Sequence, residues 1–393
     1  MPTGNAVMAR ARLGLRIGAL LLVAAISVYL LEAPRSEAAA LDRVERLAGN
    51  TVRDGHWPSL SVAYVAPGEV LWTQSFGLAD IDAERPMTPD TVMPIGSISK
   101  VIIGLTAAVE AAAGRFDVDA SLEAYWPDVP GPAASLTFRQ LATHTSGLRD
   151  TDTVYEEAGY AWGTLTHPVP LKAFLISALT PGGALYSEAT FGAAPGETRQ
   201  YSNIGAGLAA QALAEATGVP FEDLTRRNVL APLGLERVVW DATLTRNRAT
   251  LYGATDAGFE ALEPYALATW PDGGLNASVS DLARLLAAIV GGGVLDGERI
   301  IPAEAVALQR LPAFPSLTPD GLFWAYEAID LPGLSLAVEG HNGADPGLLT
   351  LMYRVDGTDR GFVLMVNGFR DTNWTLLQAA RLLLNLKRAA ERA

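Results

Sequence analysis

Strand-like segments lie at both ends of the chain, and a long, mainly helical stretch separates them. Near the N-terminal end, two apolar runs at residues 60–64 and 70–76 are joined by Pro67-Gly68, which predicts a hairpin. Near the other end, short apolar runs indicate further strands at residues 323–326, 334–338, 348–354 and 362–366. The simplest architecture is one antiparallel sheet built from both chain ends and covered by helices. The predicted fold class is therefore α+β (an α/β sandwich) with a large inserted all-helical region.

Helical spacing of apolar residues occurs in the middle of the chain and near each end. We expect helices at residues 41–52, 101–113, 204–217, 278–290 and 376–384. Ser278 and Asp281 have the spacing of a capping box at the start of one of them. This pattern predicts a sheet domain made of residues 41–95 and 320–393, and a mainly helical region at residues 96–319.

The first forty residues have the pattern of an export signal. Three arginines up to Arg16 precede an almost wholly apolar run at residues 17–31, and Ala38-Ala39-Ala40 offers a cleavage site with small residues. We predict that residues 1–40 are a signal peptide, with an uncleaved anchor at residues 13–31 as the alternative. Either one places the rest of the chain outside the cytoplasm, in the periplasm or the extracellular space.

Composition excludes several classes of function. The 393-residue chain has a net charge of −14 and no basic run, so nucleic acid is a poor candidate partner. It has no cysteine, which excludes disulfides, thiolate metal sites and cysteine nucleophiles. The metalloprotease, phosphate-loop and dinucleotide motifs are missing, so we expect no metal and no cofactor. There is also no G-x-S-x-G elbow, which argues against an α/β-hydrolase.

The segment Ser97-Ile98-Ser99-Lys100 stands at the start of a predicted helix. Ser97 and Lys100 are three residues apart, so they share one face of the first turn. A hydroxyl beside an amine at the positive end of a helix dipole can form an activated nucleophile. The alternative is an ordinary helix start with a capping serine and a solvated lysine. Only three lysines occur in the chain, and unlike arginine a desolvated lysine can lose its proton and act as a base.

Two further segments carry chemically useful side chains at element boundaries. Tyr201-Ser202-Asn203 immediately precedes a predicted helix, and His341-Asn342-Gly343 follows a predicted strand. Side chains at such boundaries can point into a cleft between domains. A phenol, an amide and an imidazole would then accompany the serine and the lysine, although each could instead be a plain loop or strand-end residue.

In this order the segments resemble the marks of the serine β-lactamase and penicillin-recognising hydrolase superfamily, in particular its class C-like branch. The marks are S-x-x-K, Y-x-N and a final K-T-G or H-x-G. Other segments that resemble this family are residues 141–148 (LATHTSGL), 195–196 (PG), 232–235 (PLGL) and 273–275 (GGL) with 280–283 (SDLA). The resemblance covers residues 41–393. It implies a serine hydrolase that acts on an ester or amide through an acyl-enzyme, with a small molecule or a peptide as substrate. Together with the export signal, this predicts an exported serine hydrolase.

The resemblance also implies roles for individual residues. Ser97 would be the nucleophile, and Lys100 would take its proton as a neutral amine, with a pKa depressed by burial and positive neighbours. Tyr201 would pass a proton to the leaving group, and Asn203 would orient Lys100. The N–H groups of Ser97 and of Ala344, the residue after the H-x-G motif, would bind the oxyanion.

The third motif departs from K-T-G, because His341, Asn342 and Gly343 stand there. A mostly neutral histidine weakens the case for an anionic β-lactam or D-Ala-D-Ala terminus and favours a neutral or cationic ester or amide. A D,D-carboxypeptidase or class C-like β-lactamase remains the alternative enzyme. A catalytically silent, cell-wall-binding or sensor paralogue is the alternative outside enzymes. We expect specificity to lie in residues 150–197 and 312–324, with Tyr155, Trp162 and Trp324 as candidate pocket walls, and we expect contact with a membrane only through the N-terminal segment.

Overall fold

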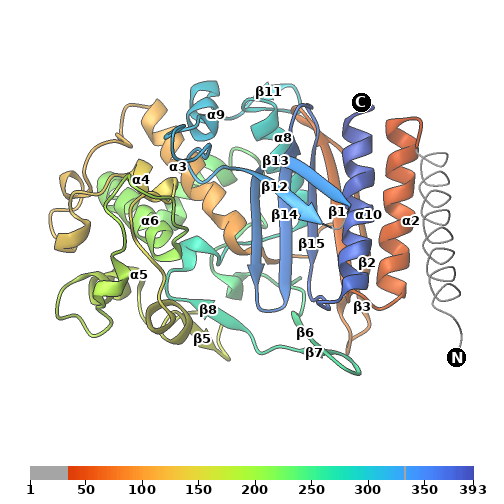
Figure 1. Ribbon diagram of the computed structural model, residues 1–393, viewed down its shortest axis with the longest axis horizontal. Helices are drawn as coiled ribbons and strands as arrows, with labels where there is room; N and C mark the ends of the chain where they lie inside the picture. Colours follow the sequence, from red (N-terminus) through yellow and green to blue (C-terminus); the bar gives the residue numbers. More distant parts are fainter. Residues whose placement is uncertain (1–33, 332) are drawn as a thin grey trace, which may run out of the picture.

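The computed structural model describes residues 34–331 and 333–393, and its central element is a seven-stranded sheet with the order β12-β13-β14-β15-β1-β2-β3 (Figure 1). Neighbouring strands pair antiparallel throughout. The strands are β1 (Ser59–Ala66), β2 (Glu69–Asp80), β3 (Arg85–Pro86), β12 (Ala325–Leu331), β13 (Leu334–Asp345), β14 (Leu348–Val355) and β15 (Gly361–Val366). The sheet therefore joins strands from both ends of the chain, as the sequence predicted.

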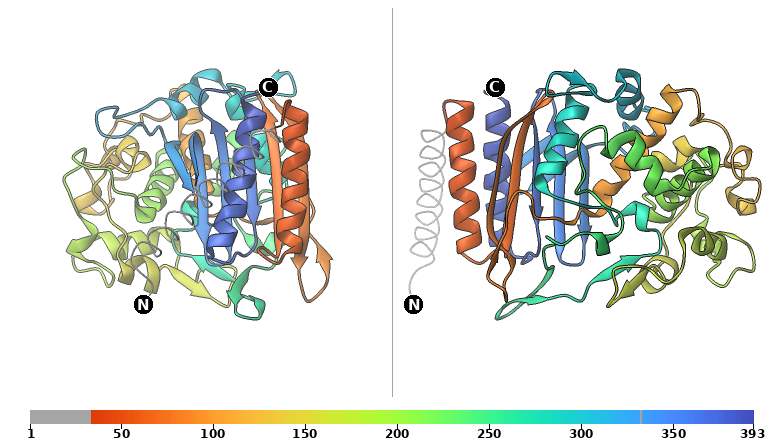
Figure 2. Two further views of the ribbon diagram at one scale, coloured as in Figure 1. Left: turned by 45° about the vertical axis from the view of Figure 1, so that its right-hand side comes forward. Right: turned by 180° about the vertical axis from the view of Figure 1, so that it is seen from behind.

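Helices cover both faces of this sheet. On one face lie α2 (Glu37–Arg53) and α10 (Asn373–Ala390), and on the other lies α8 (Val279–Val290) (Figure 2). Every residue of β1 is consequently buried, with Leu60 and Val62 in the core beneath α2 and α10 and Val65 in the larger core on the other side. Two opposite faces, each with its own apolar set, are what the period of two along a strand provides.

The helical region lies beside the sheet and is built around α3 (Ser99–Ala112), which is buried along most of its length (Figure 1). Its neighbours include α6 (Asn203–Thr217), α7 (Phe221–Thr225) and α9 (Ala303–Arg310), and α4 (Phe138–Ala142) and α5 (Leu171–Leu179) pack on α6. Short helical turns complete it: η1 (Gly96–Ile98), η2 (Leu122–Ala124), η3 (Gly131–Ala133), η4 (Asp152–Glu157), η5 (Glu188–Thr190), η6 (Arg226–Leu230), η7 (Ala242–Leu244) and η8 (Trp270–Asp272).

This region is less purely helical than the sequence suggested. It contains the two-stranded pairs β5 (Tyr160–Trp162) with β8 (Tyr265–Leu267), β6 (Tyr252–Thr255) with β7 (Gly258–Ala261), and β10 (Val294–Leu295) with β11 (Glu298–Arg299). It also contains β9 (Asn276–Ala277), which pairs with β4 (Met93–Pro94) just before the region begins. In addition α8, which belongs to the segment predicted as helical, packs on the sheet. The division at residues 96 and 319 therefore stays a prediction about domains.

Most local predictions agree with the structure. The hairpin at Pro67-Gly68 is formed, and Ser278 and Asp281 make the expected capping box at α8. Strand β12 begins at Ala325, two residues later than predicted, because Phe323 has a positive φ of 50° and cannot extend the strand.

The N-terminal prediction falls largely on residues 1–33, outside the described residues. Ser36 caps α2 by accepting a hydrogen bond from Ala39 N, so Ala38-Ala39-Ala40 forms its first turn. Among the helices of the described part, none has the length and apolar character needed to cross a membrane.

Candidate active site

Ser97 lies in the turn η1, directly before α3 and against the end of β13. Two glycines permit this close approach. Gly96 has a φ of +54°, and a Cβ on Gly343 would stand 2.1 Å from the carbonyl oxygen of Ile95. Thr350 Oγ1 donates to the same carbonyl at 2.8 Å, which ties β14 to the serine turn.

Lys100 is fully buried, and its Nζ has three hydrogen-bond acceptors. They are Ser97 Oγ at 3.0 Å, Asn203 Oδ1 at 2.7 Å and the Asp272 carbonyl oxygen at 2.7 Å. An ammonium has three donors and no lone pair, so this arrangement matches a charged lysine that donates to all three. The structure thus brings together residues from η1, α3, α6 and η8.

Electrostatics support the charged state of Lys100. Burial lowers the pKa of Lys100, but the negative charge available on Tyr201 and Asp272 outweighs burial and raises the pKa above its ordinary value. The sequence led us to expect a neutral amine with a depressed pKa. That expectation is wrong here because it assumed positive neighbours, whereas Tyr201, Asp272 and Asp150 are acidic groups that raise the pKa of Lys100.

Asp272 was not singled out in the sequence. Its side chain is fully buried, and burial raises the pKa of its carboxyl group to about 7. Thr269 Oγ1 donates to Asp272 Oδ2 at 2.5 Å, whereas Oδ1 has no hydrogen-bond partner among the residues placed in the structure. A buried carboxyl group beside a buried ammonium is a pair in which each group influences the charge of the other.

Tyr201 stands at the solvent side of this cluster, with 38% of its surface exposed. Lys100 Nζ lies 5.0 Å from the centre of the Tyr201 ring. The rings of His144 and His341 are 4.3 Å and 6.3 Å from it, centre to centre. His144 accepts a hydrogen bond from Ser202 N at 3.2 Å, and burial holds its pKa well below the usual range, so its ring is neutral and supports the Tyr201 turn.

Asp150 fixes the turn that carries Tyr201 and Asn203. Its carboxylate accepts hydrogen bonds from Ser202 Oγ at 3.1 Å, from Asn203 N at 2.7 Å and from Ile204 N at 3.0 Å. The carboxylate thus satisfies free N–H groups at the positive end of α6. The sequence contained no local signal for this role, since Asp150 lies 53 residues before Asn203.

The third predicted motif lies on β13. His341 is buried, and burial, followed by the charge of Lys100, lowers its pKa to about 4. Its Nδ1 is 2.6 Å from the Asn342 carbonyl oxygen, which can only accept, so Nδ1 carries the proton and Nε2 of the neutral ring is an acceptor. Asn342 is exposed on the same strand.

The predicted oxyanion donors lie on either side of the contact between η1 and β13. A Cβ added to Gly96 would stand 3.2 Å from Ala344 N, and one added to Gly343 would stand 3.0 Å from Ser97 N. Both amides are therefore next to the serine turn, where an oxyanion hole requires them.

Another acidic residue, Asp345, is the last residue of β13. Asp345 Oδ1 accepts a hydrogen bond from Tyr160 on β5 at 2.5 Å, and burial raises the pKa of Asp345 to about 6. Tyr155 packs edge-on against Tyr160, and the exposed Trp162 stacks on Tyr160. The loop at residues 150–197 thus brings two of the candidate wall residues to this acidic side.

Trp324, the third candidate wall, has another role. Its side chain is fully buried and its Nε1 donates to Glu339 Oε2 at 2.9 Å. It therefore packs and anchors a buried carboxylate, and the expectation that it forms a pocket wall is wrong. The sequence alone could not separate the two roles.

Comparison with known proteins agrees with this arrangement. A family model described as "Beta-lactamase" matches residues 44–385. The human mitochondrial "Serine beta-lactamase-like protein LACTB" is 35% identical over 112 residues, which are 26% of this chain and 20% of that protein. "Esterase EstB" of Burkholderia gladioli is 31% identical over 186 residues, 44% of this chain and 45% of the esterase. The matches therefore span less than half of these curated relatives.

Among solved structures, the D-amino acid amidase of Ochrobactrum anthropi SV3 in complex with D-phenylalanine has a similar fold. The TM-score is 0.69 at 21% identity, over 88% of this chain and 99% of the amidase. At this identity the likeness concerns the fold, and it confirms the predicted combination of an antiparallel sheet with a helical region.

Proposed function

The chain belongs to the beta-lactamase family, and from this premise we propose that it is a serine hydrolase that cleaves an ester or amide bond through an acyl-Ser97 intermediate. One observation carries the proposal. Lys100 Nζ joins Ser97 Oγ to Asn203 Oδ1 by hydrogen bonds of 3.0 Å and 2.7 Å, so a nucleophile, a buried cation and a polar amide from different elements meet at one point. A catalytically silent binding protein has no need for this constellation.

The charge of Lys100 determines the direction of proton transfer. A charged Lys100 has no lone pair to accept the proton of Ser97, but it stabilises negative charge on Ser97 Oγ and on the oxygen of Tyr201. In our proposal Tyr201 enters the cycle as a phenolate, stabilised by the positive charge of Lys100, and its oxygen takes the Ser97 proton as Oγ attacks the carbonyl carbon. Tyr201 then gives this proton to the leaving group as the ester or amide bond breaks, leaving acyl-Ser97.

Deacylation reverses the same steps with water as the nucleophile. Tyr201 accepts a proton from water, the resulting hydroxide attacks the acyl carbon, and the proton returns to Ser97 Oγ. In both halves the N–H groups of Ser97 and Ala344 hold the negative oxygen, and one such donor is worth about 10²–10³ in rate.

The charges around the site favour a neutral or cationic substrate. The neutral His341 offers an acceptor at Nε2, which suits a substrate N–H or O–H group rather than a carboxylate. Asp345 and Asp272 add acidic groups close by. The D,D-carboxypeptidase and class C-like β-lactamase alternatives require an anionic substrate, which the carboxyl groups of Asp345 and Asp272 disfavour.

The proposal includes export, with the folded part beginning before Ala40. Glu37 accepts hydrogen bonds from Tyr64 Oη at 3.0 Å and from Arg360 Nε at 2.9 Å, and Ala40 is buried. Cleavage after Ala40 would remove these contacts together with the Ser36 cap. We therefore favour cleavage upstream of Ser36, or the uncleaved anchor at residues 13–31, over cleavage after Ala40.

A substrate panel tests the proposed reaction. It comprises a p-nitrophenyl ester, a D-aminoacyl p-nitroanilide, nitrocefin and a peptide ending in D-Ala-D-Ala. Each is assayed with the wild type, with Ser97→Ala and with Ser135→Ala, which changes an exposed serine. We expect turnover of the ester and the anilide, loss of it in Ser97→Ala, and its retention in Ser135→Ala. No turnover on the whole panel together with specific binding to cell-wall material, or full ester turnover by Ser97→Ala, would overturn the proposal.

A further inference from the structure

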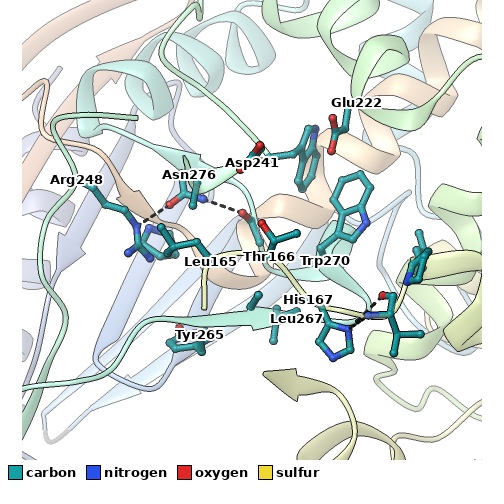
Figure 3. A pocket seen from close by; sticks show the side chains of 18 residues that line it. Leu165, Thr166, His167, Glu222, Asp241, Arg248, Tyr265, Leu267, Trp270 and Asn276 are labelled. Atoms are coloured by element: carbon teal, nitrogen blue, oxygen red, sulfur yellow. Dashed lines mark hydrogen bonds between the residues drawn. The ribbon is translucent and has the colours of Figure 1, made fainter. Parts of the chain in front are cut away.

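A cavity of about 370 Å³ lies beside the chain segment whose backbone accepts a hydrogen bond from Lys100 Nζ, and Figure 3 shows the side chains that line it. Gly274 and Asn276 line this cavity, whereas the carbonyl oxygen of Asp272, two residues earlier, accepts the hydrogen bond from Lys100 Nζ. The described residues of the lining include none of the predicted catalytic side chains. The cavity is thus a separate space that shares one wall with the candidate active site.

Arg248 supplies a cation to this cavity. Its Nε donates to Asn276 Oδ1 at 3.3 Å, and Asn276 Nδ2 in turn donates to the Gly274 carbonyl oxygen at 2.9 Å, which fixes the orientation of the amide. Figure 3 shows Arg248 and Asn276 together on one side of the cavity. In residues 34–331 and 333–393, no carboxylate comes within ion-pair distance of Arg248, and only its Nε makes a side-chain hydrogen bond.

A partly buried guanidinium without a counter-charge is costly. Burial lowers the pKa of Arg248 from its ordinary value. A guanidinium group keeps its proton in proteins, so the side chain is charged. Its planar fork of donors matches the two oxygens of a carboxylate. An anion that accepted hydrogen bonds from both terminal nitrogens would offset the free-energy cost of burying the charge.

The remaining walls are largely aromatic and apolar. Trp240 and Trp270 meet edge to face with ring centres 5.1 Å apart, and Leu165, Tyr265 and Leu267 complete the surface. Such walls bind an apolar body, while a few polar groups orient it.

Two acidic residues line the cavity away from Arg248. Asp241 accepts a hydrogen bond from Thr243 N at 2.9 Å and caps the turn η7. Burial, and next the charge of Asp241, raises the pKa of Glu222. A negative charge on the part of a ligand that lies near Asp241 and Glu222 is therefore disfavoured. The cavity suits a ligand with a single anionic group, placed at Arg248.

We propose that this cavity binds a small monocarboxylate with an aromatic or branched apolar body, and that its carboxylate pairs with Arg248. The ligand is a separate molecule from the substrate held at Ser97, and binding does not require hydrolysis. The volume falls within the range of small-molecule sites, roughly 300–1,000 Å³.

Calorimetric titration with phenylacetate, and with its neutral isostere phenylacetamide, tests the proposal on the full chain. We expect the wild type to bind phenylacetate at least about tenfold more tightly than the amide, because a hydrogen bond between two charged groups strengthens binding by about that factor. Arg248→Gln should remove the preference, and Arg246→Gln, which changes an exposed arginine two residues away, should keep it.

Thr166→Trp supplies a second variant, because Thr166 is exposed at the lining and a large side chain there would obstruct the cavity without changing the core. It should weaken phenylacetate binding even if Arg248→Gln fails to fold. Equal binding of acid and amide by the wild type, an unchanged preference in Arg248→Gln, unchanged binding in Thr166→Trp, or no saturable binding at all would each overturn the proposal.

Discussion

Replacing Asp272 by Asn tests the electrostatics of the candidate site most specifically. The substitution preserves the shape of a fully buried side chain and removes its ability to ionise. In the folded protein the pKa of Asp272 is about 7, above its ordinary value of 3.8, because burial disfavours the charged form. The folded state therefore holds a proton that the unfolded chain releases, and the stability supplied by that proton is lost as the pH rises from about 4 to about 7.

The magnitude follows from the two pKa values. Between pH 5 and pH 7.5, a carboxyl group with these pKa values lowers the free energy of unfolding by about 2.5 kcal/mol as the pH rises. The amide in the Asp272→Asn variant does not titrate, so the variant lacks this dependence. Other titrating groups, such as Asp345, contribute nearly equally to both proteins, so they cancel in the difference between wild type and variant.

Urea unfolding of the wild type and Asp272→Asn at the two pH values measures this difference, with Asp256→Asn, an exposed position, as the control. We expect the wild type to lose about 2.5 kcal/mol more than Asp272→Asn on going from pH 5 to pH 7.5. Asp256→Asn should behave like the wild type. An equal loss in wild type and Asp272→Asn would refute the reasoning, since it would mean that Asp272 is already ionised at pH 5.

Three further changes have defined outcomes. Gly343→Ala should lower kcat/KM at least about 10²-fold while the protein stays folded by circular dichroism, because the new Cβ meets the Ile95 carbonyl oxygen and displaces the serine turn. Asp150→Ala should lower the free energy of unfolding by about 1–2 kcal/mol in denaturant titration and reduce activity, since α6 loses its cap beside Asn203; unchanged stability would contradict that role. Between pH 6.5 and pH 4 the wild type should lose up to about 3 kcal/mol of unfolding free energy, because the pKa of His341 in the folded protein is about 4, below its ordinary value. His341→Gln should lack this loss in denaturant titration. An identical pH dependence in both proteins would show that folded His341 takes up its proton at the ordinary pKa.

Features that depend on neighbouring residues were predictable from the sequence. The hairpin at Pro67-Gly68, the capping box at Ser278 and the helix that follows Ser97 each depend on a few adjacent side chains. The pairing of strands from the two ends also followed, because apolar faces at both ends need a common core.

Features that depend on distant segments were not predictable in the same way. Asp150 caps a helix that begins 53 residues later, and Asp272 meets Lys100 across 172 residues of sequence. Because these two contacts arise only in the folded chain, the sequence suggested a neutral lysine and gave no sign of its acidic neighbours. The charge of a buried group is set by the whole environment that the fold assembles around it.

Intact-mass spectrometry with a fluorophosphonate tests the central claim, that Ser97 is the nucleophile, most directly. The folded protein is treated with the reagent, and the modified residue is mapped by peptide sequencing, with Ser97→Ala and Ser135→Ala treated in parallel. We expect one adduct, located on Ser97, that is absent from Ser97→Ala and present in Ser135→Ala. Folded wild-type protein that hydrolyses esters but never carries an adduct on Ser97, or that carries it on another residue, would contradict the claim.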